Sequence, residues 1–165
     1  MTLAAEIAPD DVAEGISQPD VRLIELFFFA YRDFIADPDR LLAHDGFGRA
    51  HHRVLHFVHR EPGMTVARLL SILSITKQSL GPVLRDLVAS GHLLQRPNER
   101  DRRQRLLYVT ETGRDLVTHL TRLQSQRMRA ALAAIADRPE ARETVEAFLF
   151  AMIEPEERRF MDRAA

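Results

Sequence analysis

Apolar residues near the start of the chain follow a helical repeat that covers more than one face. Between Asp20, a possible helix cap, and Ala36, one apolar stripe recurs every three or four residues, at Leu23, Leu26, Phe27, Ala30 and Phe34. A second apolar stripe is formed by Ile24, Phe28, Tyr31 and Ile35. A helix that is apolar nearly all round is buried on several sides. In so short a chain we expect a second subunit to cover it, so the pattern predicts a homodimer.

Two short helices joined by a tight turn are predicted in the centre of the chain. Thr65 is placed to cap a helix over 66–73, and Thr76 to cap a second helix that reaches Gly91. The residues Leu73-Ser74-Ile75 form the turn, and Gly91 suits the left-handed position that ends a helix. The pattern is that of a helix-turn-helix.

The remaining elements frame this pair. We expect a helix over 47–60, strands over 92–96 and 105–110 around a polar turn at 97–103, a helix over 111–135, a helix from about Pro139 with an apolar face through Ile153, and a final turn or short helix from Pro155. Breaks are predicted at Asp37-Pro38 and at Glu61-Pro62-Gly63. The fold class is therefore mainly α with a small β-hairpin wing, a winged helix-turn-helix with dimerisation helices at both ends. By residue number, 1–19 is a flexible lead, 20–46 the N-terminal dimerisation helix and linker, 47–110 the winged helix-turn-helix, and 111–165 the C-terminal dimerisation helices.

The distribution of charge agrees with this division, although the net charge is only −1. Residues 47–108 hold eleven Arg or Lys and four Asp or Glu, a net charge of +7, which leaves −8 for the rest of the chain. A basic centre between acidic ends is typical of a protein in which one module faces phosphate. Chance clustering gives the same count, so the local structure has to decide.

The second helix of the pair has a polar start and an apolar back. Its first turns offer Thr76, Lys77, Gln78 and Ser79, and its other face carries Leu80, Val83, Leu84, Leu87 and Val88. An α-helix fits the major groove of B-DNA, where polar side chains from its first turns contact base edges. An ordinary amphipathic surface helix shows the same pattern.

The arginine-rich hairpin that follows favours the DNA-binding interpretation. Five arginines lie within ten residues of one turn: Arg96, Arg100, Arg102, Arg103 and Arg105. An arginine at the tip of a wing can enter the minor groove, where A·T-rich segments concentrate negative potential. Asp101 is expected to orient a neighbouring arginine through a charge-assisted hydrogen bond. A solvated loop with ion pairs is the alternative.

The central segment SITKQSLGPVLRDLVASGHLLQRPNERDRRQRLLYVTETGRDL resembles the MarR (multiple antibiotic resistance regulator) family. Asp101-Arg102-Arg103 followed by 109–113 resembles the DxR and LTxxG signature of that family, and the resemblance extends over about 20–153. FGRAHHRVLHFV and ITKQSLGPVLRDL are similar to one proteobacterial subgroup of it.

The resemblance implies a dimer built from the first and last helices, with two recognition helices in successive major grooves about 10 bp, or about 34 Å, apart. By position, Thr76, Lys77, Gln78 and Ser79 take the major-groove contacts and Arg103 the minor-groove contact. The remaining DNA-binding candidates are Pro82, Arg85, Arg100 and Arg102. Gly81-Pro82 departs from the family pattern. Because Pro82 cannot donate to the carbonyl of Gln78, we expect it to kink the helix or to contact a thymine methyl group.

A small-molecule effector is the second expected partner, since members of this family commonly hold one between the dimer helices and the DNA-binding region. The candidate lining residues are Tyr31, Phe34, Phe47, His52 and His56. Plain core packing explains each of them equally well. His52 and His56, four residues apart, share a helix face, but the nearby arginines oppose a cation, so no metal site is predicted.

Several classes of function are excluded or disfavoured. The chain has no cysteine, which excludes disulfides and thiolate chemistry. It shows no phosphate-binding glycine loop, GxSxG or HExxH motif, so neither an enzyme nor a cofactor is expected. No signal sequence or membrane span is predicted, and the expected location is cytoplasmic. The main alternative to duplex DNA binding is a winged-helix module that binds protein or RNA.

Overall fold

The computed structural model describes residues 18–138 and 140–161. The chain divides into two compact units, residues 1–36 and 37–165, and helix α1 (Gln18–Ala43) crosses the boundary between them. Most large apolar side chains of α1 in the first unit are exposed: Val21, Leu23, Ile24, Leu26, Phe27, Phe28, Phe29 and Tyr31. These exposed side chains belong to the wide apolar surface that the sequence predicted on this helix.

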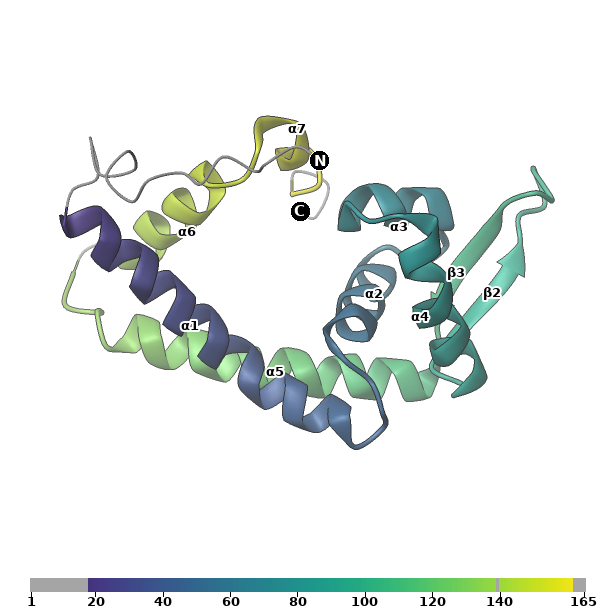
Figure 1. Ribbon diagram of the computed structural model, residues 1–165, viewed down its shortest axis with the longest axis horizontal. Helices are drawn as coiled ribbons and strands as arrows, with labels where there is room; N and C mark the ends of the chain where they lie inside the picture. Colours follow the sequence, from purple (N-terminus) through teal and green to yellow (C-terminus); the bar gives the residue numbers. More distant parts are fainter. Residues whose placement is uncertain (1–17, 139, 162–165) are drawn as a thin grey trace, which may run out of the picture. The chain divides into compact units, whose positions relative to one another are not determined.

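The second unit contains a helix-turn-helix and a small sheet. Its elements are α2 (Arg49–Arg60), β1 (Met64–Thr65), α3 (Val66–Leu73), α4 (Lys77–Ala89), β2 (Leu93–Pro97), β3 (Arg105–Val109), α5 (Glu111–Ala133), α6 (Ala141–Ala151) and α7 (Pro155–Arg158). The strands form an antiparallel sheet in the order β1-β3-β2, with Leu93 opposite Val109 and Thr65 opposite Leu106. Figure 1 shows the β2–β3 hairpin extending beyond the helices as a wing.

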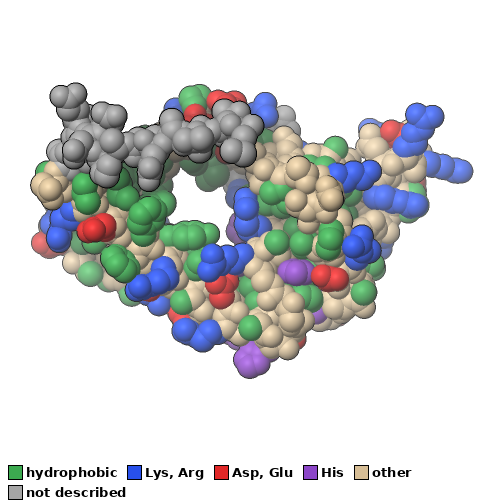
Figure 2. All heavy atoms as spheres, viewed as in Figure 1, with side chains coloured by type: hydrophobic (Ala, Val, Ile, Leu, Met, Phe, Trp, Pro, Cys, Tyr) green, Lys and Arg blue, Asp and Glu red, His purple; other side chains and the backbone are tan. Residues whose placement is uncertain are grey.

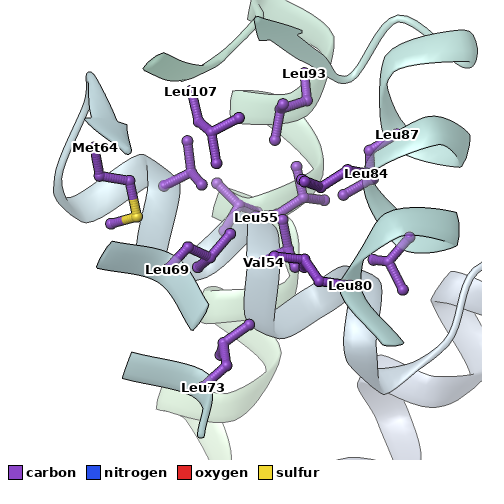
Figure 3. Packing of buried hydrophobic residues seen from close by; sticks show 13 residues of the cluster. Val54, Leu55, Met64, Leu69, Leu73, Leu80, Leu84, Leu87, Leu93 and Leu107 are labelled. Carbon is purple, nitrogen blue, oxygen red and sulfur yellow. The ribbon is translucent and has the colours of Figure 1, made fainter. Parts of the chain in front are cut away.

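A leucine-rich core joins α2, α3 and α4 to the sheet. Figure 3 shows Val54 and Leu55 of α2 in the middle of this core, with side chains from every neighbouring element around them. From α4 the core receives Leu80, Val83, Leu84 and Leu87. Each buried leucine contributes about 1.5–3 kcal/mol relative to an exposed one. The apolar back predicted for the second helix of the pair is thus what fixes α4 to the rest of the unit.

Side-chain caps start α3 and α4 at defined residues. The Thr65 hydroxyl accepts the N–H of Arg68 at 3.1 Å, and the Thr76 hydroxyl accepts the N–H of Ser79 at 3.2 Å. Both caps were predicted, as was the left-handed backbone of Gly91, whose φ is 75°. Each threonine cap is worth about 1 kcal/mol. The predicted helix-turn-helix is confirmed.

The break predicted at Asp37-Pro38 is wrong, because α1 continues through Pro38 to Ala43. A proline inside a helix lacks one hydrogen bond and costs about 3 kcal/mol unless it is compensated. Here Pro38 and Leu42, one turn apart, are the two buried residues of α1. Ion pairs from Asp39 to Arg49 (2.9 Å) and from Asp37 to Arg127 (3.3 Å) also hold this end of the helix. Burial of an apolar face outweighs the local preference of proline.

Other differences from the sequence predictions are small. Strand β1 was not predicted, α2 begins at Arg49 instead of residue 47, α5 ends two residues early, and α6 begins at Ala141. Of the expected flexible lead, 1–17 lies outside the described residues, and 18–19 belongs to α1. Within the described part of the chain, no helix is long and apolar enough to cross a membrane.

Candidate nucleic-acid interface

The start of α4 presents two polar side chains that are free to bind a partner. Lys77 and Gln78 are exposed and form no hydrogen bond or ion pair with any described residue. Thr76 and Ser79 are also exposed, but their hydroxyl oxygens lie 3.0 Å apart, and Thr76 caps the helix. Of the four residues predicted to contact the major groove, Lys77 and Gln78 are therefore the two whose polar groups remain unused.

Pro82 lies within α4 without ending it. The helix continues from Lys77 to Ala89, and both Pro82 and Arg85 are exposed. Because residues three, four and seven apart share a helix face, Gln78, Pro82 and Arg85 form one exposed face. Because Pro82 has no backbone N–H, it cannot donate to the carbonyl oxygen of Gln78, which lies in the first turn of α4.

The tip of the wing is shaped by short side-chain contacts to its own backbone. A carboxylate oxygen of Asp101 accepts the backbone N–H of Arg103 at 3.0 Å, and Asn98 accepts the N–H of Arg100 at 3.1 Å. Asp101 thus bonds to a neighbouring arginine through the main chain of that residue, Arg103. It folds the turn and leaves the arginine side chain free.

Exposed guanidinium groups extend from this tip. Figure 2 shows Lys and Arg side chains gathered on the hairpin. Arg100, Arg102 and Arg103 are exposed, and none forms an ion pair with a described residue. Arg96 differs, because its guanidinium group stacks on the ring of Tyr108 at 5.3 Å. The tip of the wing therefore offers three unpaired positive charges.

A groove of about 490 Å³ brings the helix and the wing together. Lys77 and Arg85 of α4 share it with Gln95, Arg103 and Arg105 of the hairpin. Gln95 and Arg105 were not among the predicted site residues. Side chains alternate between the two faces of a strand, and this alternation could have identified them. Gln95 pairs with buried Leu107 and lies on the same face of the sheet as buried Leu93, the face toward the helices. Lys77, Arg85, Arg103 and Arg105 give this groove four positive charges.

The residues predicted to line an effector cavity are divided between the two units of the chain. Tyr31 and Phe34 lie on α1 in the first unit, whereas Phe47, His52 and His56 belong to the second. The ring of Phe47 stacks on His51, with centroids 4.8 Å apart, and meets His92 edge to face. Phe47 is thus used in packing.

A different cavity lies between α2 and α5 and includes His56. It measures about 690 Å³ and is lined by His56, His59, Arg60, Thr118, Thr121, Arg122, Ser125, Gln126 and Arg129. Burial, Arg60 and the neighbouring histidines lower the pKa of His56, and burial lowers the pKa of His52 against the opposing effect of Asp39. No carboxylate lines this cavity, so its charge is positive. Among the described residues, no group of three or more His, Cys, Asp or Glu could hold a metal ion.

Known proteins resemble the chain over both its sequence and its fold. A profile of the MarR family matches residues 45–104. The HTH-type transcriptional regulator PetP of Rhodobacter capsulatus is 49% identical over 136 residues, which are 82% of this chain and 81% of PetP. The transcriptional repressor CouR, solved bound to a 23-mer DNA duplex, has a TM-score of 0.64 at 20% identity, covering 82% of this chain and 92% of CouR. BpsR of Bordetella bronchiseptica, whose DNA binding is regulated by 6-hydroxynicotinic acid, has a TM-score of 0.61 at 20% identity, covering 79% of this chain and 98% of BpsR.

Proposed function

The chain belongs to the MarR family of transcriptional regulators, which are DNA-binding proteins, and we propose that it reads a pseudo-palindromic DNA duplex as a homodimer. Proteins of this family act as dimers. The narrower resemblance of FGRAHHRVLHFV and ITKQSLGPVLRDL was to the subgroup that includes PetP, and the identity with PetP confirms it. In the proposed complex each subunit inserts α4 into one of two successive major grooves and its wing into a minor groove.

The observation that carries this proposal is the shared groove between α4 and the wing. It joins Lys77 and Arg85, beside the free amide of Gln78, to Arg103 and Arg105 of the hairpin. Phosphate contacts from such arginines and lysines position a protein on the duplex, and contacts to base edges select the sequence. Gln78 is the candidate for base recognition, since an amide side chain can contact adenine with two hydrogen bonds. Thr76, Ser79, Pro82, Arg100 and Arg102 complete the proposed DNA-binding set.

The dimer surface is proposed to lie on α1 and α6. Besides the apolar residues of α1, the end of α6 and its C-cap expose four large apolar side chains: Phe148, Leu149, Phe150 and Met152. Exposed apolar clusters of this kind mark protein–protein interfaces. Two-fold symmetry then gives two equivalent α4 helices, one for each half-site.

The proposed activity is binding without catalysis. A DNA-binding regulator works in the compartment that holds the DNA. Because PetP comes from a bacterium, in which that compartment is the cytoplasm, we propose a cytoplasmic location.

Fluorescence anisotropy on a palindromic promoter fragment across a salt series tests the proposal. For duplex binding, log K falls with log[salt] at a slope of about −0.9 for each neutralised phosphate. Gln78→Ala is expected to reduce discrimination between operator and mismatched duplex by about 1–3 kcal/mol. Gln124→Ala, at a glutamine of α5 that lines neither the groove nor the cavity between α2 and α5, is the matched control and should discriminate as the wild type does. Binding that ignores salt, or that prefers a protein or an RNA, would support the alternative winged-helix module instead.

We further propose that an anionic effector bound in the cavity between α2 and α5 controls DNA binding. The supporting observation is the cavity between α2 and α5, where Arg60, Arg122 and Arg129 converge with no carboxylate among the lining residues. BpsR, which shares the fold, is regulated by a carboxylic acid. An anion bound there acts on DNA affinity only through its preference for one dimer geometry.

A carboxylate and its neutral ester distinguish charge recognition from general binding. We expect 6-hydroxynicotinate, used as a probe, to raise the melting temperature and to weaken operator binding, while its methyl ester does neither. Arg122→Met should remove both effects, because it deletes one charge of the cavity. Arg138→Met, which lies outside the cavity, is the control. Equal responses to the acid and the ester would rule the anion site out.

A further inference from the structure

The C-terminal end of the described chain contacts the first helix of the helix-turn-helix. The guanidinium carbon of Arg68 on α3 lies 4.9 Å from the centroid of the Phe160 ring, just after α7. A groove of about 500 Å³ separates α7 from α3 and the turn, with Ser71 and Ser74 on one side and Glu157 and Phe160 on the other. Phe160 is half-buried. A contact of a cation with an aromatic face is attractive and directional.

Arg68 is held from two sides. Its Nε and Nη2 each lie 3.4 Å from Oε2 of Glu61, the residue that ends α2, and its side chain is 23% exposed. Its backbone N–H is the donor to the Thr65 cap. A guanidinium group fixed by a carboxylate has little freedom to follow the Phe160 ring if that ring moves. Any displacement of Phe160 therefore acts on the start of α3.

Phe160 is in turn tied to α6. From α7, Arg158 donates to the backbone carbonyl oxygens of Ile153 at 2.9 Å and Ala151 at 3.0 Å. Ala151 is the last residue of α6 and Ile153 follows its C-cap, so neither carbonyl oxygen has a partner within the helix. The guanidinium group of Arg158 also stacks on Phe150 at 5.2 Å. A continuous set of contacts thus runs from α6 through α7 to α3.

We propose that Phe160 is a positioning residue for DNA recognition, which holds the helix-turn-helix at a fixed place relative to α6 in the same subunit. This inference rests on the proposed function, in which α6 forms part of the dimer surface. If α6 is anchored at the two-fold axis, the contact of Phe160 with Arg68 sets the separation of the two α4 helices. Its removal should widen the range of half-site spacings that the dimer accepts, while a single half-site is bound as before.

The test compares operators whose half-sites differ in spacing. Palindromes with centre-to-centre spacings one base pair shorter and longer than the best are titrated with the full-length protein. We expect Phe160→Ala to reduce the preference for the best spacing by roughly fivefold, the fold-change that corresponds to losing one such contact at a partly exposed site. Phe160→Trp, which keeps an aromatic face, should retain the preference.

Two further variants keep the result interpretable. Arg159→Ala removes a contact with the same ring at 5.0 Å that does not involve α3, so it should leave the spacing preference unchanged. Arg68→Met should reproduce Phe160→Ala, and it replaces the measurement if Phe160→Ala fails to fold. An unchanged spacing preference in Arg68→Met or in folded Phe160→Ala overturns the inference, as does an equal loss on a single half-site. Absence of duplex binding by the wild type would instead overturn the proposed function.

Discussion

Replacing Gly113 with alanine is expected to lower the free energy of unfolding by about 3 kcal/mol or more, at the upper end of what overpacking costs. Gly113 lies in the first turn of α5, where a Cβ atom would overlap the carbonyl oxygen of His92 and lie 2.8 Å from Cγ1 of Val109. The same carbonyl accepts the N–H of Thr110 at 3.1 Å, so it cannot move away freely. Urea denaturation followed by circular dichroism measures the loss.

Gly81→Ala is the matched control for this substitution. Gly81 also lies in a helix, and outside its chain neighbours and the backbone of that helix its added Cβ would meet only Nη1 of Arg85, at an ordinary 3.7 Å. Alanine is favoured over glycine inside a helix by about 0.5–1 kcal/mol, but Pro82 disfavours the helical conformation for a preceding residue that carries a Cβ. These two effects oppose each other, so Gly81→Ala should stay much closer to the stability of the wild type than Gly113→Ala does. Similar stabilities for Gly113→Ala and the wild type would show that α5 can move away from the root of the wing.

Removing the side chain of Arg103 is expected to weaken operator binding about tenfold and to make the salt slope shallower by about 1. The guanidinium group is exposed and unpaired with any described residue, and it lines the groove that also contains Lys77 and Arg85. Alanine keeps the backbone N–H that donates to Asp101, so the turn of the wing stays folded. The loss should be greatest on operators with A·T-rich flanks, where the minor groove is narrow.

Arg138→Ala controls for the loss of one positive charge. Arg138 is exposed in the turn after α5, outside the groove between α4 and the wing. Anisotropy titrations of both variants at several salt concentrations separate a local contact from a general change in charge. If the two variants lose affinity equally, Arg103 has no specific place on the duplex.

Local signals explain why the helix-turn-helix could be predicted from the sequence. Thr65 and Thr76 cap their own helices through residues three positions away, and the apolar repeat of α4 is complete within one helix. The arginine-rich turn between the strands is equally local. Such features depend on neighbours in the sequence, and the sequence shows all of them.

Features that depend on distant residues were missed or misplaced. Strand β1 has two residues, and only its pairing with Leu106 and Leu107 makes it a strand. The helix through Pro38 depends on burial, which overrides the local preference of proline. For Phe47 the sequence left an effector site and core packing open, because aromatic character alone does not distinguish a cavity wall from a ring stacked on a neighbour such as His51. The cationic cavity likewise combines residues of α2 and α5 that are about 60 positions apart.

Thr65 belongs to the sheet and to the helix-turn-helix at the same time. It pairs with Leu106 of the wing, while its hydroxyl caps α3, and the N–H of Gly63 just before it donates to the carbonyl of Leu107 at 2.8 Å. Strand β1, which pairs with the hairpin, therefore runs directly into α3, and Thr65 connects the two. A duplex that displaces the hairpin must therefore also displace the helix-turn-helix. We expect the dissociation of the protein from the operator to follow a single exponential, with no intermediate in which only the hairpin or only the helix-turn-helix has dissociated.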